Sequence, residues 1–428
     1  MLDIRIIRER TDEVRSGLAR VFADLGMLDE VLALDGDCRR LQTERDALNA
    51  EVNTQSKQIG AERDAARREA LIAAIAGHKD RITVLTERLR EVEQKRDARM
   101  LELPNLPHPS VPDGKDDSEN PVLRTVGEVR PLGFSPQPHW DLATRLGIID
   151  FERGVKISGS RFYVLVGDGA RLQRALITFM LDLHTRKHGH VEVYPPYMVR
   201  RECLVGTAQL PKFGQNLYRD AEEDFWFVPT AEVPVTNLYR DEILPADRLP
   251  IQHVAYTACF RREQMAAGRD TRGIKRGHQF DKVEIVKFVR EETSMQALDQ
   301  LLAEAGEVLE ILGIPYRVVQ MCAGDLSFSA MAKFDLEAWA PGCGEWLEVS
   351  SCSNFGDFQA RRAGIRYKDG KEKPRYPHTL NGSGLALPRT LIAVLESYQQ
   401  PDGSVVVPEA LRPYMGGQER IVPGRGLG

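Results

Sequence analysis

The sequence predicts a chain of two parts: an antiparallel helical hairpin near the N-terminus, followed by a larger domain of mixed α/β structure. Apolar residues recur every seven positions between residues 34 and 100, which is typical of coiled helices. From about residue 120 onward, short strand-like runs alternate with longer helix-like ones. The chain has 428 residues, enough for roughly two or three domains and at least one large core.

The heptad pattern forms two apolar seams separated by Gly60 and a polar stretch, which indicates two antiparallel helices. Helices of about 25 to 30 residues would form an arm roughly 40 Å long. The seam positions are Leu34, Cys38, Leu41, Leu48, Val52 and Ile59 in the first half, with Arg45 as a polar member, and Leu71, Ile75, Ile82, Leu85, Leu89 and Val92 in the second.

Arginines alternate with nearly as many acidic residues along the arm, at Arg39, Arg40, Arg63, Arg67, Arg68, Arg81, Arg88, Arg90 and Arg96. The pattern leaves two interpretations open. The arm is either a solvated coiled coil that serves as a spacer or dimer zipper, or a surface whose arginines meet RNA phosphates.

Prolines end the arm, at Pro104, Pro107 and Pro109, and an acidic turn follows, so we expect a linker over 104–119. The predicted organisation is therefore an N-terminal domain over 1–103, the linker over 104–119, and a mixed α/β domain over 120–428. Within the last part we expect strands at 161–165 and 226–228 and helices at 168–188 and 294–312.

Composition is that of a globular protein, with 42% apolar and 28% charged residues and a net charge of -5. Binding to nucleic acid would therefore depend on local patches. No apolar run approaches the ~20 residues that cross a bilayer, and the N-terminus is charged throughout, so we expect a cytoplasmic protein without membrane contact.

Six cysteines are present, at Cys38, Cys203, Cys259, Cys322, Cys343 and Cys352, and no pair has C-x-x-C spacing. Reduced thiols are expected, and the spacing of cysteines and histidines does not predict zinc. Rossmann and Walker phosphate-binding motifs are also missing from the sequence. A phosphate site must therefore be built in another way.

The segment 260–288 predicts a charged hairpin, because two strand-like stretches flank a glycine-rich loop. Arg261 and Glu263 are two apart, as are Phe280, Lys282 and Glu284, so each set would share one strand face. The loop carries Gly268, Arg269, Asp270, Arg272, Gly273, Lys275, Arg276 and Gly277. Such a cationic loop suits a phosphate-bearing ligand, while the alternative is a solvated hairpin with ordinary surface charges.

Thr230 and Glu232 precede a helix-like run that extends to Leu244. Thr230 suits an N-cap, and Glu232 would favour the positive helix end. The functional alternative places both residues at the rim of a pocket that holds an ammonium or hydroxyl group.

Glu348 lies in a strand-like run after a glycine turn, where Glu348 and Ser350 would share one face and Ser351 the other. A carboxylate there needs a partner, either a salt bridge or Mg²⁺ bridging phosphates. Farther along, Pro388 fits the first turn of a helix, which puts Arg389 beside a helix N-terminus. A cation there makes sense if an anion binds beside it.

Together these segments resemble the seryl-tRNA synthetases, of the class II aminoacyl-tRNA synthetases, over essentially the whole chain. Motif 1 is similar to 191–196 (VEVYPP), motif 2 to the stretch from FRRE at 260–263 through Glu284, and motif 3 to 382–389 (GSGLALPR). The segments 230–232 (TAE) and 348–351 (EVSS) resemble the serine and ATP loops, and the heptad hairpin and 155–161 (VKISGSR) also agree.

The resemblance implies an α+β fold, with an antiparallel sheet flanked by helices and an N-terminal coiled-coil arm. It also implies a homodimer through motif 1 and an ATP-dependent ligase. Serine and ATP would form seryl-adenylate, and the seryl group would then pass to tRNA(Ser) and, by family, to tRNA(Sec).

The resemblance also assigns residues. Catalytic roles fall on Arg261, Glu348 and Arg389. ATP would be bound by Arg261, Arg262, Glu263, Phe280, Glu348, Val349, Ser350, Ser351 and Arg389, with Phe280 stacking on adenine. Serine would be bound by Thr230, Ala231, Glu232, Arg261, Glu284, Asn381 and Ser383, and Mg²⁺ by Glu348 and Ser351 through ATP.

Some positions depart from the family pattern: Gln264, Met265, Lys275, Ala208, Cys203 and Cys343. None removes a residue with an assigned role. Three alternatives to an ordinary seryl-tRNA synthetase stay open. They are a relative that passes serine to a non-tRNA acceptor, a silent RNA-binding paralogue, and a divergent second copy with altered inhibitor sensitivity.

Overall fold

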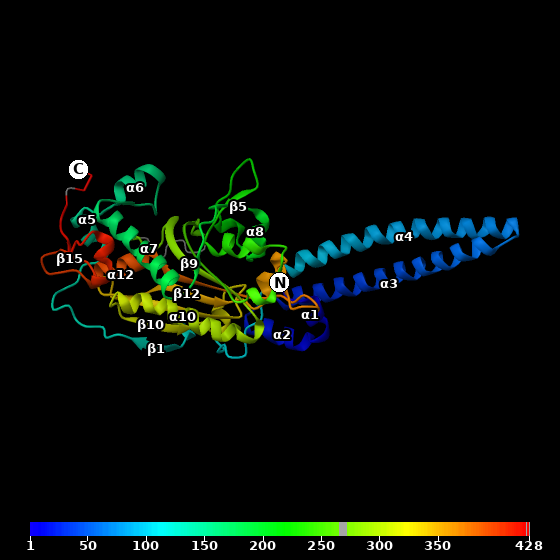
Figure 1. Cartoon of the computed structure of the whole chain (residues 1–428), viewed down its shortest axis with the longest axis horizontal. Coiled ribbons are helices and arrows are strands. Elements are labelled where there is room, and N and C mark those ends of the chain that lie inside the picture. The colour runs from blue at the N-terminus through cyan, green and yellow to red at the C-terminus, as the bar shows by residue number, and fades with distance from the viewer. Residues whose placement is uncertain (265–271, 425, 428) are drawn as a thin grey trace. The chain divides into compact units, whose positions relative to one another are not determined.

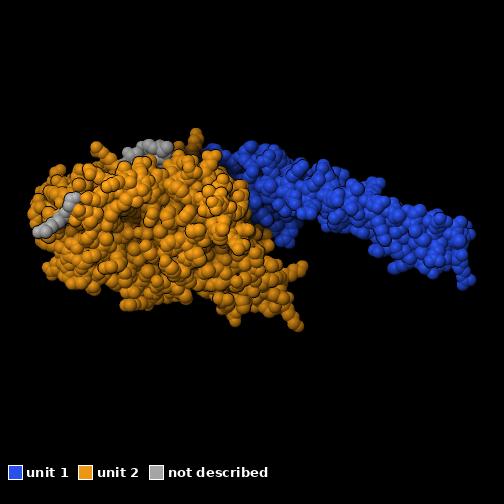
Figure 2. Space-filling model, turned by 90° about the horizontal axis from the view of Figure 1, so that it is seen from above, with its two compact units in different colours: residues 1–104 blue, residues 105–428 orange. Residues whose placement is uncertain are grey.

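The computed structural model describes residues 1–264, 272–424, 426 and 427. The chain divides into two compact units, Met1–Pro104 and Asn105–Gly428, which are coloured separately in Figure 2. The predicted loop residues Gly268, Arg269 and Asp270, and the atypical Met265, lie outside the described residues.

The first unit is helical. Its elements are α1 (Ile4–Glu9), α2 (Thr11–Arg20), α3 (Leu25–Ala61) and α4 (Ala65–Met100). The long pair α3 and α4 forms the predicted antiparallel hairpin (Figure 1). Asp24 and Asp64 cap the two helices by accepting a hydrogen bond from a first-turn amide.

The hairpin is longer than the heptads predict, because its helices contain 37 and 36 residues. At about 1.5 Å per residue each helix extends for roughly 55 Å. Gly60, expected to separate the helices, is still part of α3, and the chain turns at 62–64. The first helix begins at Leu25, nine residues before the first heptad position at Leu34, so the first boundary was placed too late.

The heptad seam itself is confirmed. Its buried centre consists of Cys38, Leu41, Leu85, Leu89 and Val92, with Leu34 and Leu48 packed beside them. Toward the turn the seam thins, since Val52 and Ile59 are only partly buried.

The second unit is built on an eight-stranded sheet in the order β1-β10-β11-β12-β14-β9-β8-β4. Every pairing is antiparallel except that of β4 with β8. The strands are β1 (Val122–Val126), β4 (Val191–Glu192), β8 (Ile251–Phe260), β9 (Gln279–Val289), β10 (Tyr316–Gln320), β11 (Ala332–Ala340), β12 (Glu345–Asn354) and β14 (His378–Ala386). This antiparallel sheet with flanking helices is the predicted α+β fold.

Three helices cover one face of the sheet: α7 (Asp168–Arg186), α10 (Ser294–Ile311) and α12 (Leu387–Ser397). Shorter helices surround the sheet, namely α5 (His139–Leu146), α6 (Phe151–Ser158), α8 (Arg201–Gly206), α9 (Glu232–Thr236) and α11 (Phe358–Ala363). Small sheets pair β2 (Ile149–Asp150) with β3 (Val164–Leu165), β5 (Met198–Arg200) with β6 (Phe225–Phe227), β7 (Ile243–Pro245) with β13 (Arg366–Lys368), and β15 (Val405–Val406) with β16 (Arg420–Ile421).

Local corrections concern two predicted elements. The strand over 161–165 is reduced to β3, because Arg161 has a φ of 63° and leaves the extended conformation. The helix-like run to Leu244 stops at Thr236, and Leu244 itself lies in β7. The helices over 168–188 and 294–312 correspond closely to α7 and α10.

Among the described residues, no helix combines the length and the apolar character needed to cross a lipid bilayer.

Candidate active site

A cavity of about 570 Å³ opens on the face of the sheet opposite to α7 and α10. The sheet places its side chains by strand alternation: Phe280, Lys282 and Glu284 of β9 point to the cavity side, whereas Lys287 points to α10 on the other side. Most predicted site residues line this cavity: Thr230, Glu232, Arg261, Glu263, Phe280, Glu348, Val349, Ser350, Ser351, Asn381, Ser383 and Arg389.

The predicted hairpin is formed by β8 and β9, which pair from Ile251 with Phe288 to Phe260 with Gln279. One detail of the prediction is wrong. Arg261 and Glu263 follow the end of β8 and do not share a strand face, because Glu263 adopts a φ of 51°. Both residues nevertheless face the cavity.

One half of the cavity is cationic. The Arg261 guanidinium lies 5.0 Å from the centre of the Phe280 ring and donates through Nε to the Pro229 carbonyl at 3.2 Å. Arg389, in the first turn of α12, donates through Nη1 to the Glu348 carbonyl at 2.7 Å and through Nε to the Lys275 carbonyl at 3.3 Å. Lys275, Arg276 and Lys333 line the same cavity. Backbone carbonyls fix the position of both arginines, and Glu348 Oε2 lies 3.5 Å from Arg389 Nη1 as an ion-pair partner.

A bulge in β12 changes which side chains face the cavity. Leu336 pairs with Ser350 and Glu337 with Glu348, so Val349 is the extra residue. The strict alternation predicted for this strand is therefore wrong: Glu348 and Ser351 both border the cavity instead of lying on opposite faces. Desolvation by the cavity wall would raise the pKa of the partly exposed Glu348, but the charges of Arg389 and Lys333 lower it below its usual range, so this carboxyl is ionised.

The other half of the cavity ends in two buried carboxylates. Glu284 accepts hydrogen bonds from Thr230 Oγ1 at 3.1 Å and Asn381 Nδ2 at 2.7 Å, and Lys282 forms an ion pair with it. Glu232 accepts from Gln359 Nε2 at 2.5 Å and from the same Asn381 amide at 3.2 Å. The pair therefore brings two carboxyl groups and one lysine together at this end of the cavity.

Glu232 is the carboxylate without a cation of its own. Burial and, next, the nearby charge of Glu284 raise the pKa of Glu232 to about 7, against the hydrogen bond from Gln359. A cationic group that entered the cavity would favour the ionised form of Glu232. This end of the cavity is therefore suited to an ammonium group.

Three predicted residues do not line the cavity. Glu284 lies beside it, hydrogen-bonded to the lining residues Thr230 and Asn381. The other two do not present their side chains to it. Arg262 turns outward, with its guanidinium 5.9 Å from the Tyr218 ring. Ala231 is fully buried in an apolar cluster with Val235 and Leu244. Any contact of these two residues with a ligand in the cavity must involve the backbone.

Lys333 and Asp335 belong to the site but were not predicted from the sequence. Lys333 of β11 lines the cavity, and its Nζ lies 3.5 Å from Asp335 Oδ2. Burial raises the pKa of Asp335 to about 7 although Lys333 opposes this shift. The sequence did contain one indication of this pair, because two residues at i and i+2 in a strand-like run share one strand face.

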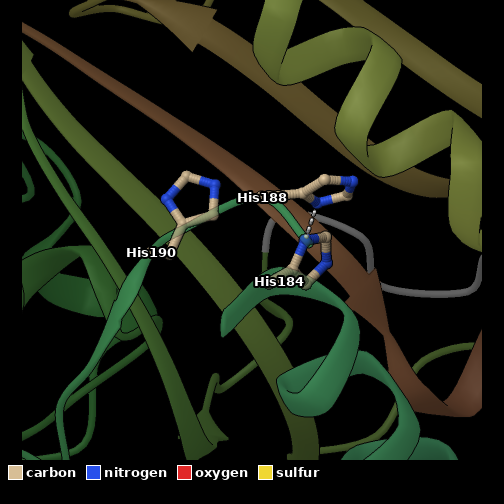
Figure 3. Close-up of side chains that lie close together, drawn as sticks. All are labelled: His184, His188 and His190. Carbon is tan, nitrogen blue, oxygen red and sulfur yellow. Dashed lines mark hydrogen bonds between the residues drawn. The ribbon is translucent and has the colours of Figure 1, made fainter. Parts of the chain in front are cut away.

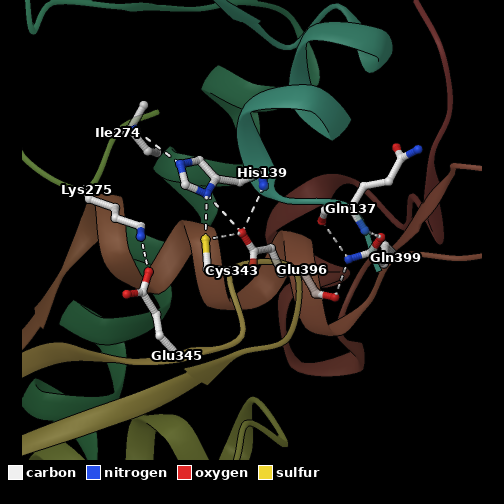
Figure 4. A network of polar contacts seen from close by, with 8 residues as sticks. All are labelled: Gln137, His139, Ile274, Lys275, Cys343, Glu345, Glu396 and Gln399. Carbon is white, nitrogen blue, oxygen red and sulfur yellow. Dashed lines mark hydrogen bonds and ion pairs between the residues drawn. The ribbon is translucent and has the colours of Figure 1, made fainter. Parts of the chain in front are cut away.

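A buried polar network supports the cationic loop from behind (Figure 4). His139 donates through Nδ1 to Glu396 Oε1 at 2.9 Å, and its Nε2 accepts from the Ile274 amide at 3.2 Å. Cys343 donates its amide to Glu396 Oε2 at 2.9 Å and its thiol to Oε1 at 3.1 Å. Because Ile274 precedes Lys275, whose carbonyl holds Arg389, the network positions an arginine of the cavity.

Comparison with known proteins agrees with this geometry. The model of the tRNA synthetase class II core domain (G, H, P, S and T) matches residues 213–398, which include most of the residues that line the cavity. The chain thus has the core of a class II aminoacyl-tRNA synthetase. The model of the seryl-tRNA synthetase N-terminal domain matches residues 1–107.

The chain belongs to the seryl-tRNA synthetase family. It is 60% identical to a serine–tRNA ligase of Thermomicrobium roseum over 422 residues, which cover 98% of this chain and 95% of that protein. The serine–tRNA ligase of a Roseiflexus species is also 60% identical, over 98% of this chain and 99% of that protein.

Solved structures agree as well. The seryl-tRNA synthetase of Pyrococcus horikoshii, complexed with ATP, superimposes with a TM-score of 0.95 at 39% identity, covering 99% of this chain and 100% of that one. The cytoplasmic serine–tRNA ligase of Naegleria fowleri, in complex with AMP, has a TM-score of 0.89 at 33% identity, with 99% of each chain covered.

Proposed function

We propose that this chain is a serine–tRNA ligase that uses the described cavity for both steps of its reaction. One observation carries the proposal: a single cavity joins a cationic half to a buried carboxylate pair. A nucleoside triphosphate and a small amino acid require this pairing of opposite charges. In the first step a serine carboxylate oxygen bonds to the α-phosphorus of ATP, and the bond to the pyrophosphate oxygen breaks. In the second step the terminal adenosine hydroxyl of tRNA attacks the seryl carbonyl, and AMP leaves.

ATP would occupy the cationic half. Arg261 would stabilise the negative charge that develops at the α-phosphate, and Arg389 would bind the far end of the triphosphate; the position of both guanidinium groups in the lining of the cavity supports these roles. Phe280 offers a ring face for adenine. Glu263, Ser350 and Val349, with the backbone of Arg262, would complete the nucleotide contacts. The residues align and neutralise charge, because the serine carboxylate itself is the nucleophile.

Mg²⁺ fits the same wall of the cavity. Glu348 is ionised and its side chain is 44% accessible, and Ser351 adds a hydroxyl oxygen, which are the hard oxygen ligands that Mg²⁺ prefers. When bound, the ion would neutralise phosphate charge and favour departure of pyrophosphate.

Serine would bind at the carboxylate end. Its ammonium group would lie by Glu232 and Glu284, with Thr230, Asn381 and Ser383 as polar neighbours and Ala231 contributing through its backbone. Buried polar groups that pair with the serine hydroxyl would be left unpaired by alanine, which provides discrimination against that amino acid.

The decisive assay has two stages: serine-dependent ATP–pyrophosphate exchange, followed by transfer of labelled serine to tRNA(Ser). Both activities are expected. Exchange without transfer would favour a non-tRNA acceptor, and absence of both would favour a silent RNA-binding paralogue. Charging of tRNA(Sec) with serine is proposed by family and is tested in the same way. Because ATP and tRNA meet in the cytoplasm, we propose that compartment for the reaction.

For domain roles we propose an N-terminal tRNA-binding domain over 1–103, a linker over 104–119 and a catalytic domain over 120–428. The α3–α4 hairpin carries exposed arginines such as Arg40, Arg81 and Arg88, which suit phosphate contacts. Replacing these arginines should raise the KM for tRNA and leave pyrophosphate exchange unchanged.

We also propose a homodimer. The edge strand β4 ends the sheet order, and around it Val191, Tyr194 and Met198 are 59%, 77% and 46% exposed. Exposed strand edges with apolar side chains are ready sites for pairing with a second chain. Light scattering after gel filtration should give twice the mass of one chain, and Tyr194→Glu should reduce it.

A further inference from the structure

Three histidines gather on the face of the sheet opposite to the cavity (Figure 3). His184 belongs to the last turn of α7, His188 follows that helix, and His190 precedes β4. Gly189 has a φ of 74°, which turns the chain so that the His190 amide donates to the His184 carbonyl at 3.0 Å. One ring nitrogen from each histidine lies within 4.8 Å of the others.

The hydrogen bonds of His184 and His188 leave a conflict between them. His184 Nε2 lies 3.2 Å from the Gly384 carbonyl oxygen, and His188 Nε2 lies 2.9 Å from Glu307 Oε2. Both of these oxygens only accept, so each Nε2 carries a hydrogen. The two Nδ1 atoms face each other at 2.9 Å. This contact requires a cation between or beside them, either a proton shared by the two rings or a metal ion.

His190 and Glu304 add further unpaired acceptors. The His190 side chain is fully buried, and its Nε2 lies 3.0 Å from Glu304 Oε2. Within the described part of the chain, His190 Nδ1 and Glu304 Oε1 are buried without a hydrogen-bond partner. Lys287 Nζ is the neighbouring cation, in an ion pair with Glu304 Oε2 at 2.8 Å, and among the described residues it also has no hydrogen-bond partner. The cluster therefore holds buried acceptors at His190 and Glu304 that no donor satisfies in this arrangement.

From this geometry we propose that His184, His188 and His190 form a site for a divalent transition-metal ion such as Zn²⁺. Imidazole nitrogens are preferred ligands of that class of ion, and three protein ligands leave a fourth position for water or for Glu304. Glu307 would orient His188 by accepting from its distal nitrogen, as carboxylates do behind histidine ligands of metals. The ion would join the end of α7 to the edge strand β4.

The network of His139, Cys343 and Glu396 provides the contrast within the same fold. These three side chains also bring potential ligand atoms together. Here, however, Glu396 accepts from His139 and Cys343, and the Ile274 amide donates to His139 Nε2. Every one of those acceptors has its donor, so this second cluster calls for no metal.

Metal uptake by the full chain tests the proposal. Protein stripped with a chelator is dialysed against micromolar Zn²⁺, and the bound metal is counted by mass spectrometry. Co²⁺ serves as a spectroscopic probe, because a tetrahedral site gives intense visible bands. We expect one ion per chain, a tetrahedral Co²⁺ spectrum and a higher melting temperature with Zn²⁺ than after stripping.

His188→Gln and His190→Gln should each abolish uptake, whereas the control His108→Gln should retain it, since His108 bonds Ser110 away from the cluster. Circular dichroism verifies that each variant folds. Uptake well below one ion per chain by the native protein, or a weak octahedral Co²⁺ spectrum, would overturn the proposal even if a variant failed to fold. Equal uptake by the variants would overturn it too, because the metal would then be bound elsewhere. That result would leave the ligase proposal untouched, since pyrophosphate exchange is measured separately.

Discussion

Replacing Glu232 by glutamine should stabilise the empty protein at alkaline pH and weaken its affinity for serine. Glu232 has a pKa raised from 4.5 to about 7, so the folded state holds a proton that the unfolded state has released between those values. Wherever the folded state binds more protons, stability falls as pH rises. The shift of 2.5 pKa units, the difference of those two values, corresponds to roughly 3 kcal/mol lost by the native protein between pH 4.5 and pH 7.

The glutamine variant avoids this loss but gives up one hydrogen bond. Gln359 and Asn381 both donate to Glu232, and a glutamine side chain has only one acceptor oxygen. Subtracting about 1 kcal/mol for that bond leaves Glu232→Gln more stable than the native chain by about 2 kcal/mol at pH 8. Near pH 4.5, where the native carboxyl is protonated, the difference should vanish or become slightly negative.

Urea unfolding at pH 5 and pH 8 measures the first effect, and pyrophosphate exchange at varied serine measures the second. Loss of the negative charge beside the ammonium group should raise the KM for serine by about 10- to 100-fold, which equals about 1.4 to 3 kcal/mol. The exposed Glu242 supplies the control, since Glu242→Gln should change neither quantity. A stability difference that is the same at both pH values would refute the reasoning about burial, and an unchanged KM would refute the assignment of the ammonium site.

Three further predictions concern the cavity, a turn and the arm. Arg389→Lys should lower the kcat/KM of exchange by about 100-fold, because lysine cannot reach the Glu348 and Lys275 carbonyls together; near-native exchange would contradict this. Ala208→Gly should raise the free energy of unfolding in urea by about 0.5 to 1 kcal/mol, because Ala208 has a φ of 66° after α8, which strains the backbone of a residue other than glycine. A destabilised variant would show that the alanine methyl contributes more than the strain costs. Replacing 40–95 by a short turn should preserve exchange and abolish tRNA charging; an equal loss of both would make the arm part of the catalytic core.

Periodic features were predictable from the sequence, and local breaks in periodicity were not. The heptads located the arm, and the β9 alternation correctly placed Phe280, Lys282 and Glu284 on one face. The bulge in β12 was invisible, because an extra residue in a strand depends on its partner strand. The early end of β8 before Arg261 has the same origin, since positive φ at Glu263 is set by tertiary contacts.

Clusters formed by residues far apart in sequence could not be predicted either. The i, i+4 spacing of His184 and His188 was readable as one helix face, yet His190 joins them through a turn, and Glu304 and Glu307 come from another helix. In the same way Gln359 gave no sign that it would meet Glu232. Such contacts follow from packing and have no local signature.

The thinning seam of the α3–α4 hairpin has a mechanical consequence. Isolated helices of this kind are marginal in water, so each turn persists only while its neighbour on the other helix shields it. Within the seam, shielding is strongest around Cys38 and Leu89 and weakest near the turn at 62–64. Amide protons should therefore exchange with solvent in order from the tip inward, and the distal turns can bend to follow a curved polyanion while the proximal turns remain rigid.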